Sequence, residues 1–473
     1  MTLQIRNQAV KGAGNSIPFA EKYFIWRKNM KFETLRDAGL LGAMSAEGRE
    51  LVLPQGIFYW SGRAKQEAEI NATIGSAQGK SSEFLEGGGD DVRTFYLPSV
   101  VKHLKALDPE KIAPYAPICG LPRYRTAWRE WIIRKLSPFY KFDSALIGQP
   151  IVSPGVTSGL AYVARLFASP GDTIVCHDRR WENYDLVLSD MLGLRIRAAR
   201  LFNEAGAGLD IDSFVDAVRE TAKTQDVVAI LNFPNNPTGY MPTVDEGLAL
   251  RKALLKVADA SGRKLILVFD DAYDGFVYEK NAAQISLFGH FIGAHPNILP
   301  VKCDGASKEF LLYGARVGSV TFAYHPSWGE TAKLSAEFDN KVGALIRGTI
   351  SNSNLAFQHA VASAIESGDE CDSERARVIS VLAERYSMIK SAMSSNLPES
   401  AVADPFNSGF FCFINLKPPA EDFADKLLKN RRLGVIPLSD SSTGFNGIRV
   451  AFCSVEAKDI PETIDRIVAE LDK

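Results

Sequence analysis

A lysine followed by an arginine eight positions later is the feature of this chain best suited to chemistry. Lys308 and Arg316 belong to the string SKEFLLYGARVG. Two blocks upstream carry further reactive or polar side chains: Asn236 in NNPTG, and Asp270 with Tyr273 in DDAY. An amine can bond covalently to an aldehyde, an arginine fork binds phosphate, and a carboxylate can keep a ring nitrogen protonated. Together these residue types suit a cofactor that has an aldehyde, a phosphate and a basic ring.

Pyridoxal phosphate (PLP) has all of these groups, and enzymes hold it on a lysine amine. Lys308 is predicted to hold the aldehyde and Arg316 the phosphate. Asp270 is predicted to face the pyridine nitrogen and keep it protonated. Asn236 and Tyr273 can each donate a hydrogen bond to the phenolic oxygen of the ring. The sequence therefore offers a residue for each contact that this cofactor needs.

Each of these residues also has an ordinary interpretation. Most lysines lie on the surface, and NNPTG consists of turn-forming residues. Asp270 has a neighbour, Asp271, that could take its place, although the D-x-A-Y spacing favours Asp270. Ser307, next to the lysine, is a further candidate for the cofactor site. The agreement of three separate blocks favours the cofactor interpretation over the ordinary ones.

The composition excludes several other classes of function. The chain has 473 residues, of which 46% are hydrophobic and 23% charged, and its net charge of -2 does not favour nucleic acid or an anionic membrane. No apolar run is long enough to span a bilayer, and the N-terminus is too polar for a signal peptide. The six cysteines form no CxxC pair and the six histidines show no metal-ligand spacing. We expect a cytoplasmic protein with reduced thiols and no metal site.

Short apolar runs alternate with amphipathic segments between about 120 and 330, which predicts a mostly parallel sheet flanked by helices. Ligands in such sheets bind beyond the carboxyl ends of the strands. Asn236, Asp270 and Lys308 each end or follow a predicted strand, so they are expected on one rim of the sheet. The predicted strands are Pro150–Val152, Thr173–Cys176, Val227–Phe233, Leu265–Phe269 and Ile298–Cys303.

Three further positions extend the predicted site. The segment Thr157–Ala161, with Gly159, Leu160 and Ala161 at its end, joins a strand to a helix predicted from Leu160 to Phe167. Free N–H groups at such a junction can bind a phosphate. Trp181 can stack on the pyridine ring or simply pack in the core. Arg449 lies in an apolar strand, where a bidentate contact to a substrate carboxylate would satisfy its charge.

The chain is predicted to contain a large and a small domain. Residues 1–95 are assigned to an N-terminal extension and part of the small domain, and residues 96–374 to the large cofactor-binding domain. Residues 375–473 are assigned to the rest of the small α+β domain, because a long helix from Ala376 to Ser394 is followed there by short strands and a final helix.

These blocks together resemble the fold-type I PLP aminotransferases of class I/II, over roughly residues 70–455. The resemblance implies an α/β fold with a large, mostly parallel domain and a smaller α+β domain. It also implies that Lys308 is the Schiff-base lysine, that Asp270 is the partner of the pyridine nitrogen, and that Arg449 binds the substrate's α-carboxylate. Trp181 is similar to the family's ring-stacking tryptophan.

The likeness is greatest to the aspartate aminotransferase branch. Tyr115 lies in a block similar to Y-x-P-I-x-G-L, whose tyrosine reaches the phosphate of the neighbouring subunit. Arg347 lies in a block whose arginine crosses the dimer interface to a substrate's distal carboxylate, although an interface salt bridge is an alternative role. Gly75 matches the loop that closes over the substrate. The resemblance thus implies a homodimer with shared active sites.

Two positions depart from the family pattern. Gly305 replaces the serine that commonly binds the phosphate three residues before the lysine, and Ser307 or Ser158 could substitute for it. Tyr184 replaces a histidine that supports the pyridine-facing aspartate in similar enzymes. The N-terminal part is also longer than the common form. These departures suggest a divergent subgroup.

We therefore expect a PLP-dependent aminotransferase that acts on aspartate or glutamate with a 2-oxo acid such as 2-oxoglutarate. Three other activities could use the same residues: an aromatic amino acid aminotransferase, a β-lyase and an aspartate β-decarboxylase. A ligand-sensing regulator would need a basic helix-turn-helix module at one end. Residues 1–60 show no such pattern.

Overall fold

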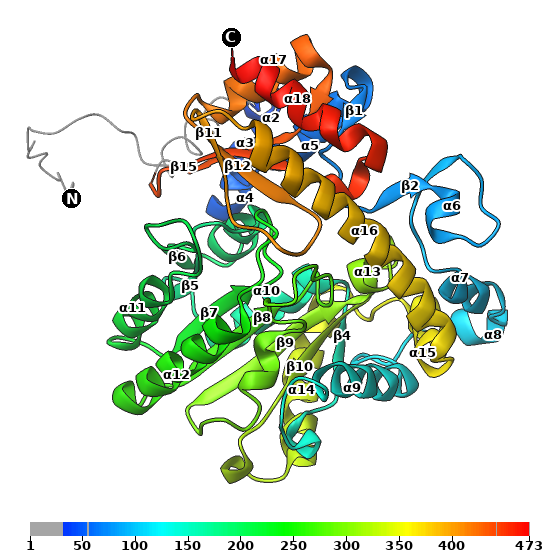
Figure 1. The fold of residues 1–473 in the computed structure, drawn as a ribbon. Coiled ribbons are helices and arrows are strands. Elements are labelled where there is room, and N and C mark those ends of the chain that lie inside the picture. The colour runs from blue at the N-terminus through cyan, green and yellow to red at the C-terminus, as the bar shows by residue number, and fades with distance from the viewer. Residues whose placement is uncertain (1–31, 54–55, 441, 473) are drawn as a thin grey trace, which may run out of the picture.

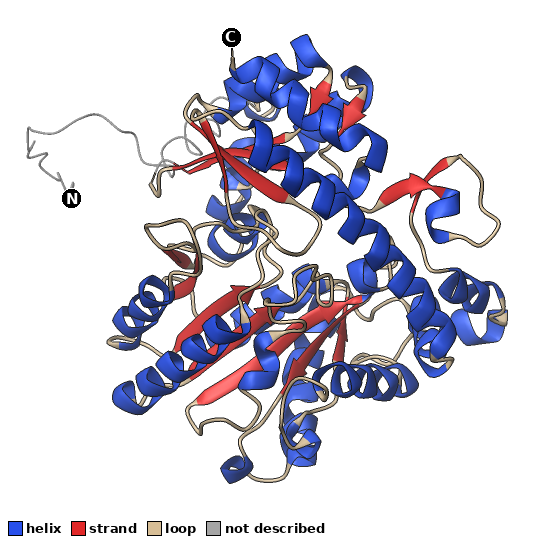
Figure 2. Cartoon of the chain, in the orientation of Figure 1, coloured by secondary structure: helices blue, strands red, loops and turns tan. Residues whose placement is uncertain are grey.

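The computed structural model describes residues 32–53, 56–440 and 442–472. The first 31 residues of the predicted N-terminal extension lie outside them. Figures 1 and 2 show a large lower part built on one sheet and a smaller upper part. The long helix α16 (Asp369–Asn396) runs between the two parts. We retain the division at residues 95 and 374 as a proposal.

A seven-stranded sheet forms the centre of the lower part, and all its neighbouring strands are parallel except at β10 (Gly318–Phe322), which is antiparallel to both of its neighbours. From one edge to the other the strands are β4 (Ile151–Ser153), β10, β9 (Ile298–Gly305), β8 (Leu265–Asp270), β7 (Val227–Asn232), β5 (Thr173–His177) and β6 (Arg195–Ala199). The five predicted strands are present, but β6 and β10 were not predicted. The sheet confirms the predicted α/β class.

Successive residues of the central strands enter two different hydrophobic cores. In β7, Val227, Ala229 and Leu231 belong to the core that includes α11 (Ile211–Ala222) and α12 (Val244–Ser261). The residues between them, Val228 and Ile230, belong to the second core, with residues of α10 (Val156–Phe167) and α14 (Thr331–Thr349). Burial on both faces explains why these strands are continuous apolar runs without alternation.

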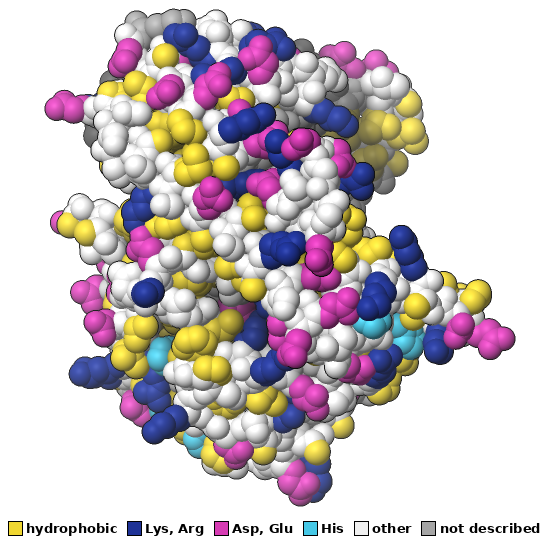
Figure 3. All heavy atoms as spheres, turned by 45° about the vertical axis from the view of Figure 1, so that its right-hand side comes forward, with side chains coloured by type: hydrophobic (Ala, Val, Ile, Leu, Met, Phe, Trp, Pro, Cys, Tyr) yellow, Lys and Arg dark blue, Asp and Glu magenta, His cyan; other side chains and the backbone are white. Residues whose placement is uncertain are grey.

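The helices of the lower part cover both faces of the sheet (Figure 1). They are α7 (Pro98–Lys105), α8 (Pro109–Ile112), α9 (Pro122–Leu136), α10 (Val156–Phe167), α11, α12, α13 (Ala306–Glu309), α14 (Thr331–Thr349) and α15 (Leu355–Glu366). Among the described residues no helix is long and apolar enough to cross a membrane. Figure 3 shows basic and acidic side chains interspersed over the face in view.

The upper part is built on an antiparallel sheet in the order β11 (Ala401–Ala403), β12 (Cys412–Leu416), β15 (Phe445–Val450) and β14 (Ile436–Asp440). Residues near the N-terminus join this part, because β1 (Ile70–Asn71) pairs with β13 (Leu433–Gly434). A separate ribbon pairs β2 (Gln78–Lys80) with β3 (Val92–Thr94). The remaining helices are α2 (Glu33–Asp37), α3 (Leu40–Ala43), α4 (Ala46–Glu50), α5 (Gly56–Glu67), α6 (Ser81–Phe84), α17 (Ala420–Arg431) and α18 (Ile460–Leu471).

Candidate active site

The predicted lysine lies in a short helix between two strands of the large sheet. Lys308 belongs to α13, which follows β9 directly. Its Nζ donates to the carbonyl oxygen of Gly75 at 2.9 Å and lies 4.9 Å from the centre of the Tyr313 ring. Burial, together with the nearby charges of Arg449 and Arg316, lowers the pKa of Lys308 to about 8. A larger share of this amine is therefore neutral, and nucleophilic, near neutral pH than for an exposed lysine.

Asp270 ends β8 and is 3% exposed. The Tyr184 hydroxyl donates a hydrogen bond to Asp270 Oδ2. Burial raises the pKa of Asp270 to about 6, while the bond from Tyr184 favours the charged form. Tyr184 thus supports this carboxylate in the position where similar enzymes have a histidine. Asp271 instead binds Lys302 at 2.6 Å, so the structure separates the two aspartates that the sequence left as alternatives.

Arg449 lies in β15 of the smaller sheet and reaches down to the larger one. Its Nη1 donates to Asn236 Oδ1 at 3.2 Å and its Nη2 to the carbonyl of Thr73 at 3.1 Å. The guanidinium lies 4.2 Å from the centre of the Phe411 ring. The side chain is buried, its Nε has no hydrogen-bond partner, and no carboxylate among the described residues lies within 4.0 Å of it. A buried cation in this state is suited to binding a carboxylate from outside.

The NNPTG segment places Asn236 beside Arg449. The Asn236 amide nitrogen of the backbone donates to Asn232 Oδ1 at 2.9 Å, which fixes the turn to the end of β7. Gly239 adopts a positive φ of 75°, and a Cβ there would come within 2.0 Å of the Phe411 carbonyl oxygen. Glycine is therefore required where this turn meets the smaller sheet.

Tyr273 is buried between aromatic rings on the same rim. Its ring makes edge contacts with Phe410 and Phe411, with centroids 5.2 and 5.6 Å away. Lys308 Nζ lies 5.7 Å from the Tyr273 ring centre. Burial raises the pKa of the Tyr273 phenol, so this hydroxyl remains a neutral hydrogen-bond donor.

Arg316 and the start of α10 form a second polar corner of the site. Arg316 Nη2 lies 3.4 Å from the Pro154 carbonyl and its Nη1 lies 3.5 Å from Ser307 Oγ. Gly155 precedes α10 with a φ of 89°, and a Cβ there would lie 2.2 Å from Arg316 Nη2. The guanidinium therefore lies against the N-terminus of a 12-residue helix, an arrangement that attracts a phosphate.

The predicted N–H donors of this corner require a correction. Helix α10 begins at Val156 rather than at Leu160, and the Gly159 amide donates to the Gly155 carbonyl at 3.3 Å. Leu160 and Ala161 lie deeper in the helix, where amides donate within the helix. The amides of residues 156–158, in the first turn, are the ones left for an anion.

Gly305 has a steric explanation. A Cβ at Gly305 would lie 2.8 Å from both the Gly318 Cα and the Val317 carbonyl oxygen. A serine cannot enter this position unless the backbone of β10 moves. Ser307 Oγ, at 3.5 Å from Arg316, is the nearer substitute of the two that were predicted, because Ser158 Oγ is directed to the Pro154 carbonyl.

Of the other predicted residues, Trp181 contacts a residue of the candidate site, whereas Tyr115 and Arg347 are exposed in the single chain. Trp181 packs edge-on against Tyr184, with ring centroids 5.8 Å apart. Tyr115 is 87% exposed, and the exposed Arg347 donates to Ser351 Oγ. Their predicted roles require a second subunit and remain predictions. Tyr313 was not predicted from the sequence, although it lies beside the lysine; its hydroxyl accepts a hydrogen bond from the Ala77 amide at 2.9 Å.

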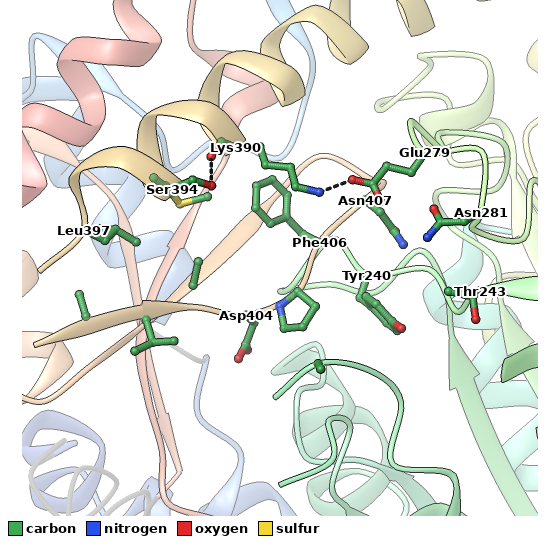
Figure 4. Close-up of a pocket in the computed structure, with 16 residues that line it drawn as sticks. Tyr240, Thr243, Glu279, Asn281, Lys390, Ser394, Leu397, Asp404, Phe406 and Asn407 are labelled. Atoms are coloured by element: carbon green, nitrogen blue, oxygen red, sulfur yellow. Dashed lines mark hydrogen bonds and ion pairs between the residues drawn. The ribbon is translucent and has the colours of Figure 1, made fainter. Parts of the chain in front are cut away.

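A different cavity, of about 460 Å³, lies between the lower and upper parts (Figure 4). Glu279, Lys390, Asp404 and Asn407 are among the residues that line it. Lys390 pairs with Glu279, and Asp404 accepts a hydrogen bond from Asn415 at 2.7 Å. None of the residues around Lys308 lines this cavity, and its charges are already paired.

Comparison with known proteins defines the class. The sequence profile of aminotransferase class I and II matches residues 89–467, so the chain belongs to this family. It is an aminotransferase, and the family uses PLP.

Its relatives are distant. The chain is 25% identical over 372 residues to an aspartate aminotransferase of Sulfurisphaera tokodaii. The matched region covers 75% of this chain and 83% of that protein. It is 24% identical over 413 residues to aromatic-amino-acid aminotransferase 2 of Thermococcus litoralis, covering 85% and 94%. The crystal structure of an aminotransferase from Anaerococcus prevotii has a TM-score of 0.78 and 25% identity, covering 91% of this chain and 99% of that one.

The residues present fit PLP. Lys308 is a half-buried amine with a lowered pKa, Asp270 is a buried carboxylate, and Arg316 lies at a helix N-terminus. These three groups match the aldehyde, the ring nitrogen and the phosphate. Arg449 and Asn236 remain for the substrate side of the site.

Replacing Tyr184 by Phe is expected to move the pH dependence of PLP binding. The variant loses the hydrogen bond that favours charged Asp270, so the pKa of Asp270 rises above about 6. A hydrogen bond to a charged group contributes about 1.5–3 kcal/mol, which corresponds to roughly 1–2 pH units. The dissociation constant of PLP is measured on apo-protein from pH 9 down to pH 5. As the pH falls and Asp270 becomes protonated, this constant should begin to rise at a higher pH in the variant than in the wild type. An unchanged profile would contradict a role of Tyr184 in charging Asp270.

Proposed function

We propose that this chain transfers an amino group between aspartate or glutamate and a 2-oxo acid such as 2-oxoglutarate, with PLP held at Lys308. The observation that supports this most strongly is Arg449. Its buried guanidinium has no carboxylate partner in the part of the chain that the structure describes, and it is hydrogen-bonded to Asn236 of the cofactor rim. A neutral ligand would leave this cation uncompensated, whereas the α-carboxylate of an amino acid would pair with it.

Lys308 has two tasks in this proposal. Its amine holds the aldehyde of the cofactor, and once displaced by the substrate's amine it acts as general base on the α-carbon proton. A pKa of about 8 suits both tasks, because the neutral and protonated amines are both well populated near neutral pH. When bound, PLP supplies the electron-accepting ring that makes this proton acidic.

The remaining residues orient and tune the ring. Asp270, with Tyr184 behind it, would keep the pyridine nitrogen protonated. Tyr273 and the Asn236 amide would donate to the phenolic oxygen. Arg316, Ser307 and the first turn of α10 would hold the phosphate, and Trp181 would cover one face of the ring.

We also propose a homodimer located in the cytoplasm. Apolar side chains exposed in the single chain support the dimer: Ile118 is 39% and Ile350 41% exposed, close in sequence to Tyr115 and Arg347. In the dimer, Tyr115 would reach the partner's phosphate and Arg347 the partner's substrate. Six free cysteines support a reducing compartment.

Replacing Arg347 by Leu is expected to lower kcat/KM for aspartate far more than for alanine or tyrosine. Loss of a charge-assisted contact to the distal carboxylate should cost at least about 2 kcal/mol, or about 30-fold. Initial rates with 2-oxoglutarate and each amino acid give the comparison. Lys333→Leu, an exposed lysine on the same helix, is the matched control. Equal losses for all three amino acids would reject the assignment of Arg347.

A mixing experiment decides whether Arg347 acts across the dimer. With aspartate, Lys308→Ala is expected to be inactive and Arg347→Leu to retain at most about 3% of wild-type activity. In a mixed dimer, one site would combine an intact Lys308 with an intact Arg347 from the other subunit. Random exchange of equal amounts should restore about one quarter of wild-type activity. No restoration in proven mixed dimers would show that Arg347 serves its own subunit.

An aromatic amino acid aminotransferase is the second candidate, supported by the similarity to the Thermococcus litoralis protein. The same panel of amino acids separates the two, because tyrosine would then exceed aspartate in kcat/KM. Pyruvate and ammonia, or alanine and CO2 from aspartate, formed without an acceptor would instead indicate a β-lyase or a β-decarboxylase.

A further inference from the structure

A buried network of charges lies directly behind the candidate active site. It joins strand β9, the turn that follows β8 and three helices of the described structure, and no part of the function proposed above uses it. Its members are Lys135, Asp271, Asp274, Lys302, Asp304, Glu309 and Arg375.

Lys302 is the centre of this network. Its side chain is 0% exposed, and its Nζ lies 2.6 Å from Asp271 Oδ2, 2.9 Å from Asp274 Oδ2 and 3.7 Å from Asp304 Oδ2. Burial lowers the pKa of Lys302, but Asp271 and Asp274 more than offset this effect and keep the amine charged. A cation in this position cannot be removed without leaving its carboxylates buried and unpaired.

The second half of the network reaches the helix that carries Lys308. Lys135, from α9, pairs with Glu309 and lies 2.8 Å from Asp274 Oδ2. Trp131 Nε1 donates to Glu309 Oε1 at 2.6 Å. Arg375, from α16, donates to the Glu309 backbone carbonyl at 2.9 Å. Glu309 is thus held both by its side chain and by its backbone.

Three acids of the network are immediate chain neighbours of candidate site residues. Asp271 follows Asp270, Asp274 follows Tyr273, and Glu309 follows Lys308. A contact that fixes each acid therefore also fixes the backbone from which the neighbouring site residue extends. Site groups must be held within about 0.5 Å of their working geometry, so the rigidity of this backbone matters to the reaction.

We propose that Lys302 is a positioning residue. It holds Asp270 and Tyr273 through the neighbouring acids Asp271 and Asp274, and it reaches Lys308 indirectly, because Lys135 joins Asp274 to Glu309. The inference rests on the proposed function, because that function assigns Asp270, Tyr273 and Lys308 to the cofactor. It also explains why a lysine occupies a fully buried strand position in β9, where an apolar residue would otherwise be expected.

The balance of charge supports this role. Three cations face four carboxylates, so the fully charged network has one excess negative charge. Burial raises the pKa of Asp304 to about 7, which lets this acid hold a proton. Removing Lys302 would raise the excess to two, whereas removing a carboxylate would cancel it.

The test compares four proteins: wild type, Lys302→Met, Asp271→Asn and the double variant. The dissociation constant of PLP and the Tm are measured on each apo-protein, and kcat and KM are measured on each PLP-loaded protein with the amino donor and a 2-oxo acid acceptor. Lys333→Met, an exposed lysine, serves as the control.

Lys302→Met should weaken PLP binding and lower kcat by about tenfold or more each, with KM changed by less than about threefold. Asp271→Asn should show a smaller loss of about threefold. The double variant should lie closer to Asp271→Asn than to Lys302→Met, because it removes one charge of each sign. Lys333→Met should remain within about twofold of wild type.

Two results would overturn the proposal. A Lys302→Met protein with a lower Tm but unchanged PLP affinity and kcat would show a purely structural role. A double variant no better than Lys302→Met would show that shape, not charge, matters. If Lys302→Met does not fold, Asp271→Asn decides, since wild-type affinity and kcat there would also overturn it. Failure of the proposed function is distinct, because it would appear in the wild-type protein itself, which would then not bind PLP or not transaminate aspartate or glutamate.

Discussion

Replacing Lys308 by Ala is expected to lower transamination by about 10⁴-fold or more, because the variant loses both the covalent attachment of PLP and the general base. Lys302, the nearest lysine in sequence, cannot take over, because its amine is bound by Asp271 and Asp274. Steady-state rates and the absorbance of the purified variant measure the two losses separately.

Two controls sharpen this prediction. Lys333→Ala removes an exposed lysine and should leave the rate within about twofold of wild type. A small primary amine added to Lys308→Ala should restore part of the rate, since the missing group is a base in an otherwise intact site. A Lys308→Ala protein that retains more than about 1% of wild-type activity would contradict the assignment.

Replacing Asp270 by Asn should lower kcat by about 10²- to 10³-fold, because a neutral amide cannot keep the pyridine nitrogen protonated. The substitution preserves the shape of the side chain, and Tyr184 can still hydrogen-bond to it. The effect therefore reports the charge rather than a cavity. Measurement of kcat under saturating substrate, with full PLP occupancy confirmed by absorbance, separates the chemical loss from a loss of cofactor.

The neighbouring aspartate provides the matched control. Asp271 has the same side chain but binds Lys302 and Ser286 instead of facing the site. We expect Asp271→Asn to lose only about threefold, at least tenfold less than Asp270→Asn. A larger loss for Asp271→Asn would exchange the roles of the two residues.

The residues on the rim of the sheet could be predicted because each strand and the polar motif that follows it are adjacent in the sequence. Strands β7, β8 and β9 are apolar runs buried on both faces, and each is followed at once by a polar motif. The same logic failed for β6, an edge strand with exposed Arg195 and Arg197, whose polar positions do not form an apolar run. It also placed the start of α10 too late, because Gly155 rather than Gly159 precedes that helix.

Contacts between distant segments could not be predicted in the same way. The pairing of Arg449 with Asn236 joins residues 213 positions apart, and the network around Lys302 requires α9, α13 and α16 to meet. Burial of a lysine depends on partners that only the folded chain brings together. Tyr115 and Arg347 remain predictions for a related reason, since their proposed partners belong to a second subunit.

The half-reaction without acceptor tests the central claim most directly. The absorbance spectrum of the purified protein is recorded before and after aspartate is added, and the 2-oxo acid formed is counted per subunit. We predict a visible absorbance band that is lost on addition of aspartate, with stoichiometric formation of oxaloacetate. A visible band that responds to tyrosine or alanine but not to aspartate would reject the dicarboxylate assignment. The absence of a visible band, even after PLP is added, would contradict the role of Lys308 and with it the proposed function.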